Sequence, residues 1–392
     1  MRILLCNFEY PPLGGGGGVV MAAMARALAC RHEVTVLTSR AAWLAGEDDD
    51  QGVRVVRVPV LFRRQLAVAN LPSMAAYLPA AAWRGLRLGR RAKFDVINTH
   101  FVVPTGPVGA WLAQQLRIPH VLSVHGGDLY DPSKSSSPHR HALLRWAIAR
   151  LLRRADVVVA QSRDTARNVS ELYGVQRAIE LIPLGIERPP PRAPAARQEF
   201  DIPAEACVLL SAGRLVARKA SLQLIETLHA VRDAVLLVVG DGPEAAPLMA
   251  RAAARGVAQR VRMLGYVDEA TKQRAFCVAD IFVSTSQHEG FGLVFLEAMA
   301  AGLPIVCYDR GGQTDFLHTP ANGYVVPLND LAAFNSAVAL LRESPQTRAA
   351  IARNNLAAVE DYFIERCAER YEQLFAATLA RAPQVPGRQV LV

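Results

Sequence analysis

The sequence has few of the features that would indicate a disulfide scaffold, a metal centre or a membrane span. Its six cysteines are scattered without a C-x-x-C pair, so we expect reduced thiols, most of them in a core. Its nine histidines show no ligand spacing, so no metal is expected. The apolar run 66–83 is interrupted by Asn70, Pro72 and Pro79 and is not expected to span a membrane. Residues 1–8 are too short an apolar run for a signal peptide, and a cytoplasmic location is predicted.

Acidic residues are scarce in the first half of the chain. Residues 1–186 hold 23 Lys and Arg against 13 Asp and Glu, a net of +10, whereas the remaining residues hold 21 against 22. Three basic clusters stand out: Arg63 with Arg64; Arg84, Arg87, Arg90 and Arg91 with Lys93; and Arg145, Arg150, Arg153 and Arg154. The excess predicts contact with an anionic lipid surface, such as the inner face of the cytoplasmic membrane, or with a phosphorylated acceptor. The alternative is a solvated arginine-rich surface. No nucleic-acid partner is expected.

The length and the pattern of the chain predict two α/β domains. With 392 residues, 51% of them hydrophobic, each half can bury a core of its own. Short β-branched runs alternate with helical stretches, which is typical of a doubly wound parallel sheet. Residues 183–203 carry six prolines and predict the connection between the domains. Two such domains form a ligand crevice where the carboxyl ends of their strands face one another.

The expected strands and helices follow from these runs. Expected strands cover residues 2–7, 34–38, 53–58, 95–99, 120–124, 156–160 and 179–182, and then 207–211, 235–239, 261–264, 280–283 and 304–307. Expected helices include residues 19–29, 138–154 and 291–301, and the last helix begins near residue 364.

Residues 283–305 are the most informative stretch. An apolar strand ends in a polar loop that closes with Glu289 and Gly290, and an apolar helix follows, stopped by Gly302 and Pro304. A flexible loop before a helix N-terminus presents free N–H groups and makes an anion site. Glu297 lies eight residues after Glu289, so one acid lies beside the anion site and the other deeper in the helix. This layout suits a ligand with a phosphate in the middle and hydroxyls at both ends, such as a sugar nucleotide. The alternative is that both glutamates are solvated charges.

These residues resemble a known family. Glu289 and Glu297 form the E-x7-E pattern of retaining glycosyltransferases of the GT-B fold, and residues 289–302 are similar to that segment in glycosyltransferase family 4. Residues 308–316 and 322–327 are similar to the next two blocks of the same family. The resemblance implies two Rossmann-like domains facing across a cleft. Residues 1–186 would bind the acceptor, with the helix in 364–392 packing back on them, and residues 187–363 would bind the donor.

Five consecutive glycines, Gly14 to Gly18, follow the first strand and open a helix. They fit the dinucleotide motif G-x-G-x-x-G poorly, because Val19 stands at its last glycine and the second strand ends without an acid, so a dehydrogenase is disfavoured. The resemblance implies a mobile loop that closes on a diphosphate, with Gly15 and Gly16 as the contacts.

Two cations follow the first strand of the second domain. Arg214 and Lys219 are five residues apart and can stabilise the charge that develops on a leaving β-phosphate. The segment is similar to the family block G-R-L-x-x-x-K-G, but it has Ala220 in place of the last glycine. Arg218 leaves open which of the three cations reach the ligand.

The rest of the donor site is implied by the resemblance. Gly240 and the backbone of Tyr266 and Val267 would line the nucleotide, and uracil is the preferred base. The helix N-terminus at Phe291, Gly292 and Leu293 would hold the diphosphate together with the cations. Glu297 would accept the ribose hydroxyls, and Glu289 would contact the transferred sugar.

His125 follows a strand in the first domain and resembles the histidine with which the family approaches the sugar. A histidine after a strand can also be purely structural. Asp128 and the loop 131–137 are further candidates that would shape the acceptor site. His100 and Asn98 are weaker ones, for which a core role is at least as good an explanation.

The sequence therefore predicts a retaining, metal-independent glycosyltransferase without a cofactor. It would move a hexose from a nucleoside-diphosphate sugar, preferably a UDP-sugar, to a hydroxyl of a saccharide or lipid-linked acceptor in cell-surface glycan synthesis. Retention would proceed by departure on the front face, with the leaving phosphate taking the acceptor proton. The alternatives are a small soluble acceptor, a sugar-nucleotide epimerase or phosphorylase, and a non-catalytic lectin or scaffold of the same fold.

Overall fold

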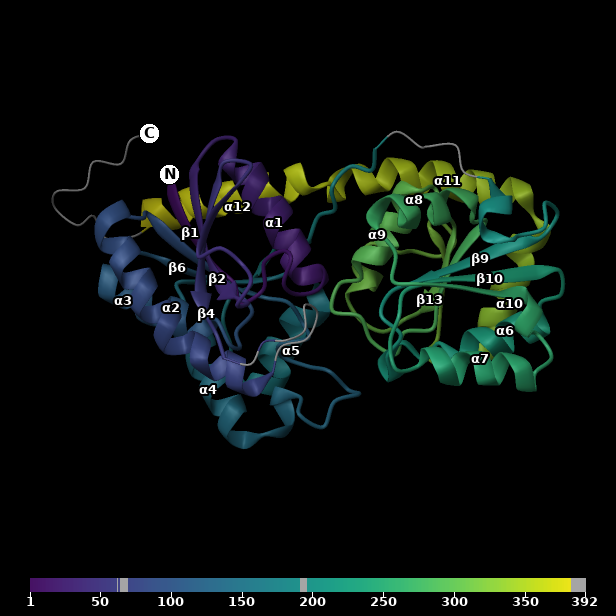
Figure 1. The fold of residues 1–392 in the computed structure, drawn as a ribbon, viewed down its shortest axis with the longest axis horizontal. Coiled ribbons are helices and arrows are strands. Elements are labelled where there is room, and N and C mark those ends of the chain that lie inside the picture. Colours follow the sequence, from purple (N-terminus) through teal and green to yellow (C-terminus); the bar gives the residue numbers. More distant parts are fainter. Residues whose placement is uncertain (62, 64–69, 191–195, 382–392) are drawn as a thin grey trace. The chain divides into compact units, whose positions relative to one another are not determined.

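The computed structural model describes residues 1–61, 63, 70–190 and 196–381 and divides the chain into two compact units (Figure 1). Unit 1 contains Met1–Ile186 and the segment that begins at Phe363, and unit 2 contains Glu187–Tyr362. Arg64 and residues 66–69 of the apolar run lie outside the described residues. Among the described helices, none combines the length and the hydropathy needed to cross a membrane.

Unit 1 is built on an eight-stranded sheet with the order β3-β4-β2-β1-β5-β6-β7-β8. The strands are β1 (Arg2–Cys6), β2 (Glu33–Arg40), β3 (Glu47–Asp50), β4 (Val53–Pro59), β5 (Val96–His100), β6 (His120–Val124), β7 (Val157–Ala160) and β8 (Glu180–Leu181). All neighbouring strands pair in parallel except β3 with β4. The strand order reverses between β1 and β5, and in such sheets ligands bind at the carboxyl ends beside that point.

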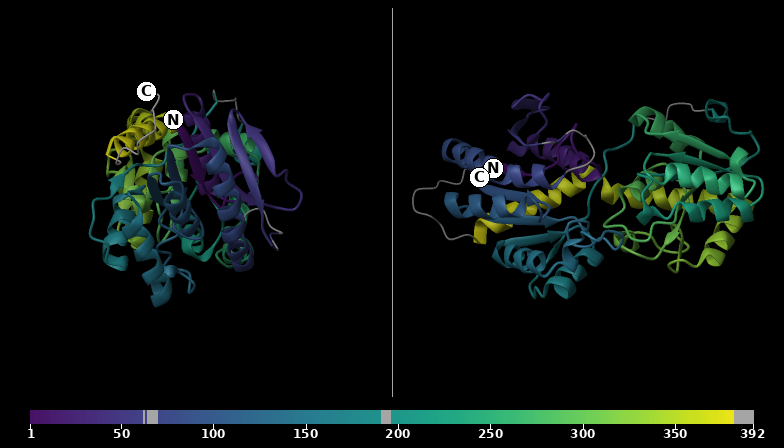
Figure 2. Two further views of the ribbon diagram at one scale, coloured as in Figure 1. Left: turned by 90° about the vertical axis from the view of Figure 1, so that its left-hand side faces the viewer. Right: turned by 60° about the horizontal axis from the view of Figure 1, so that its bottom comes forward.

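Helices cover both faces of this sheet (Figure 2). They are α1 (Gly16–Ala29), α2 (Leu71–Ala92), α3 (Gly106–Leu116), α4 (Ala142–Arg154), α5 (Arg163–Tyr173) and α12 (Ile364–Arg381). A core under α2 and α3 gathers around Leu37, Tyr77 and Leu112, and another under α4 and α5 gathers around Leu122 and Leu152. The parallel strands are buried on both sides, which explains their continuous apolar runs.

The C-terminal helix α12 belongs to unit 1 although it is last in the sequence. It packs against α1, and its Glu372 carboxylate contacts the Arg31 guanidinium at 2.7 Å and the His32 ring at 3.0 Å. Its Tyr371 hydroxyl donates to the Ser123 Oγ at 2.9 Å, so the helix reaches the end of β6.

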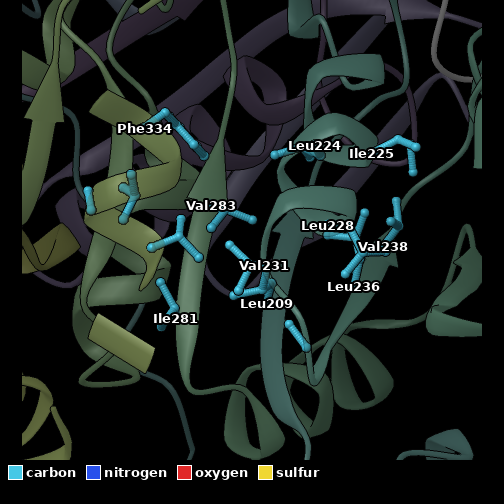
Figure 3. Packing of buried hydrophobic residues seen from close by; sticks show 14 of the residues in the cluster. Leu209, Leu224, Ile225, Leu228, Val231, Leu236, Val238, Ile281, Val283 and Phe334 are labelled. Carbon is cyan, nitrogen blue, oxygen red and sulfur yellow. The ribbon is translucent and has the colours of Figure 1, made fainter. Parts of the chain in front are cut away.

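Unit 2 has a six-stranded parallel sheet with the order β11-β10-β9-β12-β13-β14. The strands are β9 (Cys207–Ala212), β10 (Ala234–Val239), β11 (Val261–Gly265), β12 (Ile281–Ser284), β13 (Ile305–Tyr308) and β14 (Gly323–Val326). The helices are α6 (Leu222–Ala230), α7 (Ala245–Ala254), α8 (Glu269–Val278), α9 (Leu293–Ala300), α10 (Leu331–Glu343) and α11 (Pro345–Ala358). Side chains from β9, β10 and β12 pack against α6 and α10 in the core (Figure 3). Here the strand order reverses between β9 and β12, so the loops after these two strands meet at the switch point.

The prediction of two Rossmann-like α/β domains is confirmed, and the differences lie at edges and boundaries. β3 was not expected because its sequence, Glu47–Asp50, is entirely acidic. It forms because β4 offers basic partners across the ladder: the Arg54 guanidinium contacts Glu47 at 2.9 Å and the Arg57 guanidinium contacts Asp48 at 3.4 Å. The helix expected at 138–154 begins with a 3₁₀ turn over Pro138–Arg140, and the α-helix starts only at Ala142.

Candidate functional site

The loop after β12 leads into α9 and leaves the start of that helix open. Gly292 is the N-cap residue with φ of +94°, a conformation that suits glycine, and a Cβ there would lie 2.5 Å from the Phe295 ring. Among the described residues, no side-chain hydrogen bond caps α9. The first N–H groups of an α-helix, here those of Leu293 and Val294, have no partner within the helix. The start of α9 therefore has the donors and the dipole that favour an anion.

Phe291 lies in the same loop, but its ring is part of the core. It is 4% exposed and its centroid is 5.2 Å from that of Phe316. The helix expected from residue 291 starts at Leu293 instead, because Gly292 turns the chain before it. Any contact of Phe291 with a ligand is therefore limited to its backbone.

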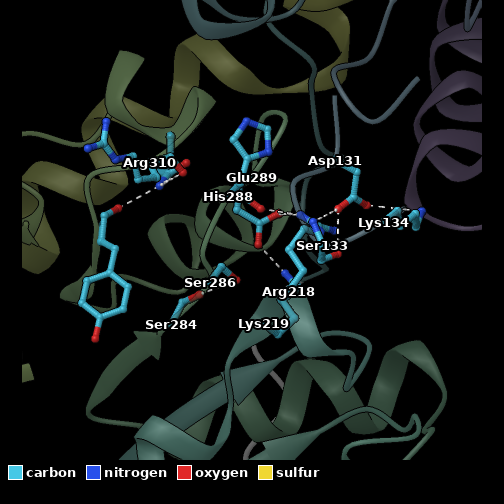
Figure 4. A network of polar contacts seen from close by, with 12 residues as sticks. Asp131, Ser133, Lys134, Arg218, Lys219, Ser284, Ser286, His288, Glu289 and Arg310 are labelled. Atoms are coloured by element: carbon cyan, nitrogen blue, oxygen red, sulfur yellow. Dashed lines mark hydrogen bonds and ion pairs between the residues drawn. The ribbon is translucent and has the colours of Figure 1, made fainter. Parts of the chain in front are cut away.

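Glu289 is held by two cations from the loop after β9 (Figure 4). The Lys219 ammonium donates to its Oε1, and the Arg218 guanidinium contacts Oε2 at 3.4 Å. Burial would raise the pKa of the Glu289 carboxyl, but Lys219 and Arg218 outweigh it and lower that pKa to about 2. Glu289 is therefore a carboxylate at neutral pH, although it is only 7% exposed.

The two loops are also joined through their backbones. The Thr285 hydroxyl donates to the carbonyl oxygens of Lys219 at 3.1 Å and Ala220 at 3.0 Å, and Arg218 donates to the His288 carbonyl. On the other side, the Glu289 carbonyl accepts the Gly312 N–H at 2.9 Å. A Cβ at Gly311 would lie 2.0 Å from the same carbonyl, so glycine is required there. Glu289 is thus fixed by the segments that follow β9, β12 and β13.

Glu297 lies inside α9 with a cation of its own. Its Oε1 accepts from the Lys272 ammonium of α8 at 3.0 Å. Burial raises the pKa of the Glu297 carboxyl, while Lys272 opposes that shift. Its side chain is 25% exposed, so it remains accessible to hydroxyl donors.

The structure brings Arg218, rather than Arg214, to Glu289. Arg214 is exposed, and its guanidinium has no ion pair or hydrogen bond to the rest of the described chain. Of the two cations expected from the sequence, Lys219 contacts Glu289 and Arg214 does not. Arg218, whose role the sequence left open, is the second cation at Glu289.

The other expected donor residues lie on neighbouring loops of unit 2. Gly240 follows β10 with φ of +131°, and a Cβ there would lie 2.1 Å from the Gly213 carbonyl oxygen. Tyr266 follows β11 and is 92% exposed, and Val267 beside it is partly exposed. Gly240, Tyr266 and Val267 thus share the carboxyl edge of the sheet with Glu289.

The glycine-rich loop of unit 1 opens α1 at the carboxyl end of β1. Gly15 is the N-cap, its N–H donates to the Glu9 carboxylate at 3.1 Å, and a Cβ there would meet nothing within 4 Å. Gly16 is the first residue of the helix. In contrast, a Cβ at Gly17 would lie 2.5 Å from the Phe101 ring. Glycine is thus needed sterically at Gly17, whereas Gly15 leaves open space.

His125 follows β6 and stacks on Phe101 with ring centroids 4.3 Å apart. Its Nε2 lies 3.0 Å from the Nδ1 of His100, whose Nε2 lies 2.7 Å from the Asn98 Oδ1. Burial lowers the pKa of His125 to about 4, so the ring is neutral at pH 7. The weaker candidates His100 and Asn98 therefore form one hydrogen-bonded group with His125.

Asp128 and Asp131 both accept hydrogen bonds from nearby residues. The Asp128 carboxylate accepts the N–H groups of Val102 at 2.7 Å and His125 at 2.9 Å, and burial raises its pKa to about 6. The Asp131 Oδ1 accepts the Ser133 hydroxyl at 2.7 Å, and Lys134 contacts the other oxygen at 3.3 Å.

Gln161 is a polar residue at this edge that was not expected from the sequence. It follows β7, and Val124 and Ala160 are register partners, so His125 and Gln161 occupy adjacent strand ends. It is 3% exposed, and neither its Nε2 nor its Oε1 has a hydrogen-bond partner among the described residues. A buried amide of this kind calls for a ligand or a water. A single Gln after a strand carries no such signal in sequence.

Two family models match the chain, one in each half. "Glycosyltransferase Family 4" matches residues 14–188, and "Glycosyl transferases group 1" matches residues 193–357.

Curated proteins of several kinds are similar to the chain. Glycogen synthase of Mycobacterium tuberculosis is 30% identical, over 98% of this chain and 97% of that protein. The GDP-mannose-dependent alpha-(1-6)-phosphatidylinositol monomannoside mannosyltransferase of Mycolicibacterium smegmatis is 29% identical, over 89% and 91%. The 2-deoxystreptamine glucosyltransferase of Streptomyces kanamyceticus is 29% identical, over 67% and 72%.

Solved structures share the fold along the whole chain. Sucrose-phosphate synthase from Thermosynechococcus elongatus has a TM-score of 0.82 at 21% identity, covering 97% of this chain and 99% of that one. Alr3699/HepE of Anabaena, solved with UDP, has a TM-score of 0.76 at 20% identity, covering 96% and 100%.

Proposed function

This chain belongs to glycosyltransferase family 4 and is a glycosyltransferase, and from that premise we propose that it moves a hexose from a nucleoside-diphosphate sugar to a hydroxyl of a saccharide or lipid-linked acceptor. The transfer retains the anomeric configuration and needs no metal. UDP-sugars are the proposed donors, and the UDP bound to the related fold supports this choice. The observation that carries the proposal is the pair of cations around Glu289 beside the start of α9, which no side chain in the described part of the chain caps.

That cluster suits a diphosphate because its cations outnumber its single carboxylate. Lys219 and Arg218 share the single carboxylate of Glu289, and Arg214 stands exposed on the same loop. A diphosphate at the start of α9 would draw on Lys219 and Arg214 as negative charge develops on the departing β-phosphate. The leaving phosphate would take the proton of the acceptor hydroxyl as the new glycosidic bond forms on the same face of the sugar.

The two glutamates and His125 take the hydroxyls of the donor in this proposal. Glu297 accepts from the ribose, because its side chain is partly exposed and lies about one turn into α9 from the anion site. Glu289 contacts the transferred hexose as a carboxylate fixed in place by Lys219. We also propose His125 as a contact of the same sugar, and Gly15 and Gly16 as contacts of the diphosphate.

A lipid-linked acceptor is supported by an exposed face of α4. Leu143 and Trp146 on this helix are 77% and 61% exposed, and Arg150 lies over the Trp146 ring at 5.8 Å. The helix contains Arg145, Arg153 and Arg154 as well and no acidic residue. Exposed apolar side chains beside arginines suit the headgroup region of an anionic bilayer. The phosphatidylinositol monomannoside acceptor of one relative supports the same class.

The alternative is a small soluble acceptor. It is supported by the relative named for 2-deoxystreptamine, which has the same 29% identity as the mannosyltransferase, over 67% rather than 89% of this chain. In that case the apolar face of α4 would have no part in binding the acceptor, and activity would be independent of lipid.

Donor hydrolysis by the purified chain tests the proposal. We expect release of a nucleoside diphosphate from one member of a panel of UDP-, GDP-, ADP- and TDP-sugars, and retention at the anomeric carbon when an alcohol accepts the sugar. EDTA should leave the rate unchanged. If calorimetry detects no binding of any nucleoside diphosphate, the proposed donor class is wrong. Hydrolysis with inversion would contradict the proposed mechanism alone.

A further inference from the structure

A chain of buried polar side chains connects α12 with His125 across the end of the unit 1 sheet. The Tyr371 hydroxyl donates to the Ser123 Oγ at 2.9 Å, and the Asn98 Nδ2 donates to the same oxygen at 2.9 Å. The Asn98 Oδ1 contacts the His100 Nε2 at 2.7 Å, and the His100 Nδ1 contacts the His125 Nε2 at 3.0 Å. Three segments that are distant in sequence, β5, β6 and α12, therefore contribute side chains to the hydrogen-bonded chain that ends at the His125 ring.

The direction of each proton in this chain follows from the amide of Asn98. Its Nδ2 faces the Val121 carbonyl at 3.2 Å as well as Ser123, and a carbonyl can only accept. The Oδ1 therefore points at His100 and must accept the proton of the His100 Nε2. Burial, with His125 beside it, lowers the pKa of His100 well below its usual value, so its Nδ1 carries a lone pair. That lone pair accepts the proton of the His125 Nε2.

The remaining nitrogen of His125 is then an unprotonated acceptor. Its Nδ1 is buried and has no hydrogen-bond partner among the described residues. A neutral imidazole has one donor and one acceptor nitrogen, and the donor is already used by His100. The free nitrogen can accept from a hydroxyl but cannot serve as a donor to a phosphate oxygen.

We infer that Asn98 and His100 are positioning residues that fix His125 in its Nε2–H tautomer, so that its Nδ1 binds a hydroxyl of the transferred sugar as a hydrogen-bond acceptor. The sugar as the ligand of this nitrogen rests on the proposed function. The tautomer rests on the contacts of unit 1 alone. His125 is thus a neutral binding group for a polyol, rather than a cation for the diphosphate or a base that removes the acceptor proton.

Nitrogen-15 NMR of the full chain labelled in its histidines tests the tautomer directly. The His125 signals are assigned by their loss in His125→Gln. At pH 7 we expect a protonated, pyrrole-type Nε2 and an unprotonated, pyridine-type Nδ1. A protonated Nδ1, or an imidazolium, would overturn the inference without reference to any activity.

Two substitutions at position 100 separate positioning from packing. His100→Phe keeps a ring but removes the acceptor, so we expect the His125 tautomer to change or become mixed and kcat/KM to fall about 10- to 100-fold, as for other residues that orient a site ligand. His100→Gln offers both an amide donor and a carbonyl acceptor, so it should restore the wild-type signals and most of the activity. If His100→Phe folds and keeps both the tautomer and the rate, the positioning role is wrong.

Thr99→Val is the matched control, because it removes the 2.9 Å hydrogen-bond partner of another buried histidine, His120, from the same strand. It should leave the His125 signals and kcat/KM unchanged. Tyr371→Phe should keep the tautomer, since Asn98 retains Ser123 and Val121 as acceptors. A wild-type chain that shows the expected tautomer but hydrolyses no donor would refute the proposed function and leave the hydrogen-bond chain in place.

Discussion

At the scale of single residues, three cations on one loop have different surroundings. Lys219 contacts the Glu289 carboxylate, Arg218 bonds both that carboxylate and the His288 carbonyl, and Arg214 is exposed to solvent. An exposed guanidinium can turn to a ligand at little cost, whereas Arg218 would first have to leave the backbone of the neighbouring loop. The three side chains should therefore contribute differently to turnover and to stability.

Alanine substitutions separate these contributions. We expect Lys219→Ala and Arg214→Ala to lower kcat/KM by about two orders of magnitude or more, the usual loss when a group that stabilises transition-state charge is removed. Arg218→Ala should mainly lower the free energy of unfolding, because a buried carbonyl and a buried carboxylate each lose a donor. Arg353→Ala, at an exposed position of α11, is the control for loss of positive charge. Donor hydrolysis rates and urea unfolding of each variant check this, and near-normal turnover in a folded Lys219→Ala chain would remove Lys219 from the mechanism.

Residues of the proposed site could be predicted from the sequence where they belong to a motif with fixed spacing. The spacing of Glu289 and Glu297 and the block around Lys219 are enough to indicate a donor site in that segment. The partners of these residues were not predictable, because they come from the fold. Lys272 reaches Glu297 from another helix, and Gly311 allows the Glu289 backbone to lie close beside the loop after β13. Tyr371 and His100 meet through Ser123 and Asn98, which no spacing in the sequence encodes.

At the scale of elements, the strongly apolar strands were predictable and the unusual ones were not. β6 (His120–Val124) has the expected bounds, because an apolar run buried on both faces has only one plausible extent. β14 (Gly323–Val326) was missed, since a run of four residues beside a glycine resembles a loop. The acidic β3 violates strand propensity and exists through its charged partners on β4.

The helix α4 gives a prediction about lipid. Replacing both Leu143 and Trp146 by serine should weaken binding of the full chain to phosphatidylglycerol vesicles by about tenfold or more, because each side chain buries apolar area worth about 1.5 to 3 kcal/mol when fully inserted. Trp43→Ser is the matched control, since Trp43 is similarly exposed, at 57%, but lies outside α4. Co-sedimentation at low and high salt provides the measurement. Equal binding by all variants, or no binding by the wild type, would mean that the arginines form only a solvated surface and do not bind lipid.

The helix α12 gives a prediction about stability. It places Cys367, Tyr371 and Phe375 in the interior of unit 1, and Phe375 is fully buried. Phe375→Ala should lower the free energy of unfolding of unit 1 by about 3 to 5 kcal/mol, which is usual for the loss of a buried phenyl ring. Gln373→Ala, at an exposed position on the same helix, should change it by less than about 0.5 kcal/mol. Urea unfolding followed by hydrogen exchange in β1 and β6 locates the effect. Equal loss from both variants would mean that the helix is not part of that core.

At the scale of the whole molecule, the two units carry different kinds of buried titratable groups. Unit 1 contains His120 and His125, each with a pKa lowered to about 4 by burial, and His100, whose pKa burial lowers well below its usual value. Unit 2 contains Glu289, whose pKa is lowered to about 2 because Lys219 and Arg218 outweigh its burial. In both cases the unfolded chain takes up protons at a higher pH than the folded chain does. Stability is therefore lost on acidification, but over different ranges of pH.

We expect unit 1 to weaken between about pH 6.5 and 4, and unit 2 between about pH 4.5 and 2, the lower limits being the pKa values in the folded chain. Protonation of each of the two histidines lowers the free energy of unfolding of unit 1 by on the order of 3 kcal/mol. Protonation of Asp128, whose pKa is raised to about 6, raises that free energy and offsets about as much as one histidine. Hydrogen exchange, corrected for the intrinsic rate, should show β5 and β6 losing protection at pH 5 while β9 and β12 keep it. His120→Phe should remove part of the loss in unit 1 and leave unit 2 unchanged. If both units lose protection together near pH 4, carboxylates rather than buried histidines determine the acid limit of unit 1.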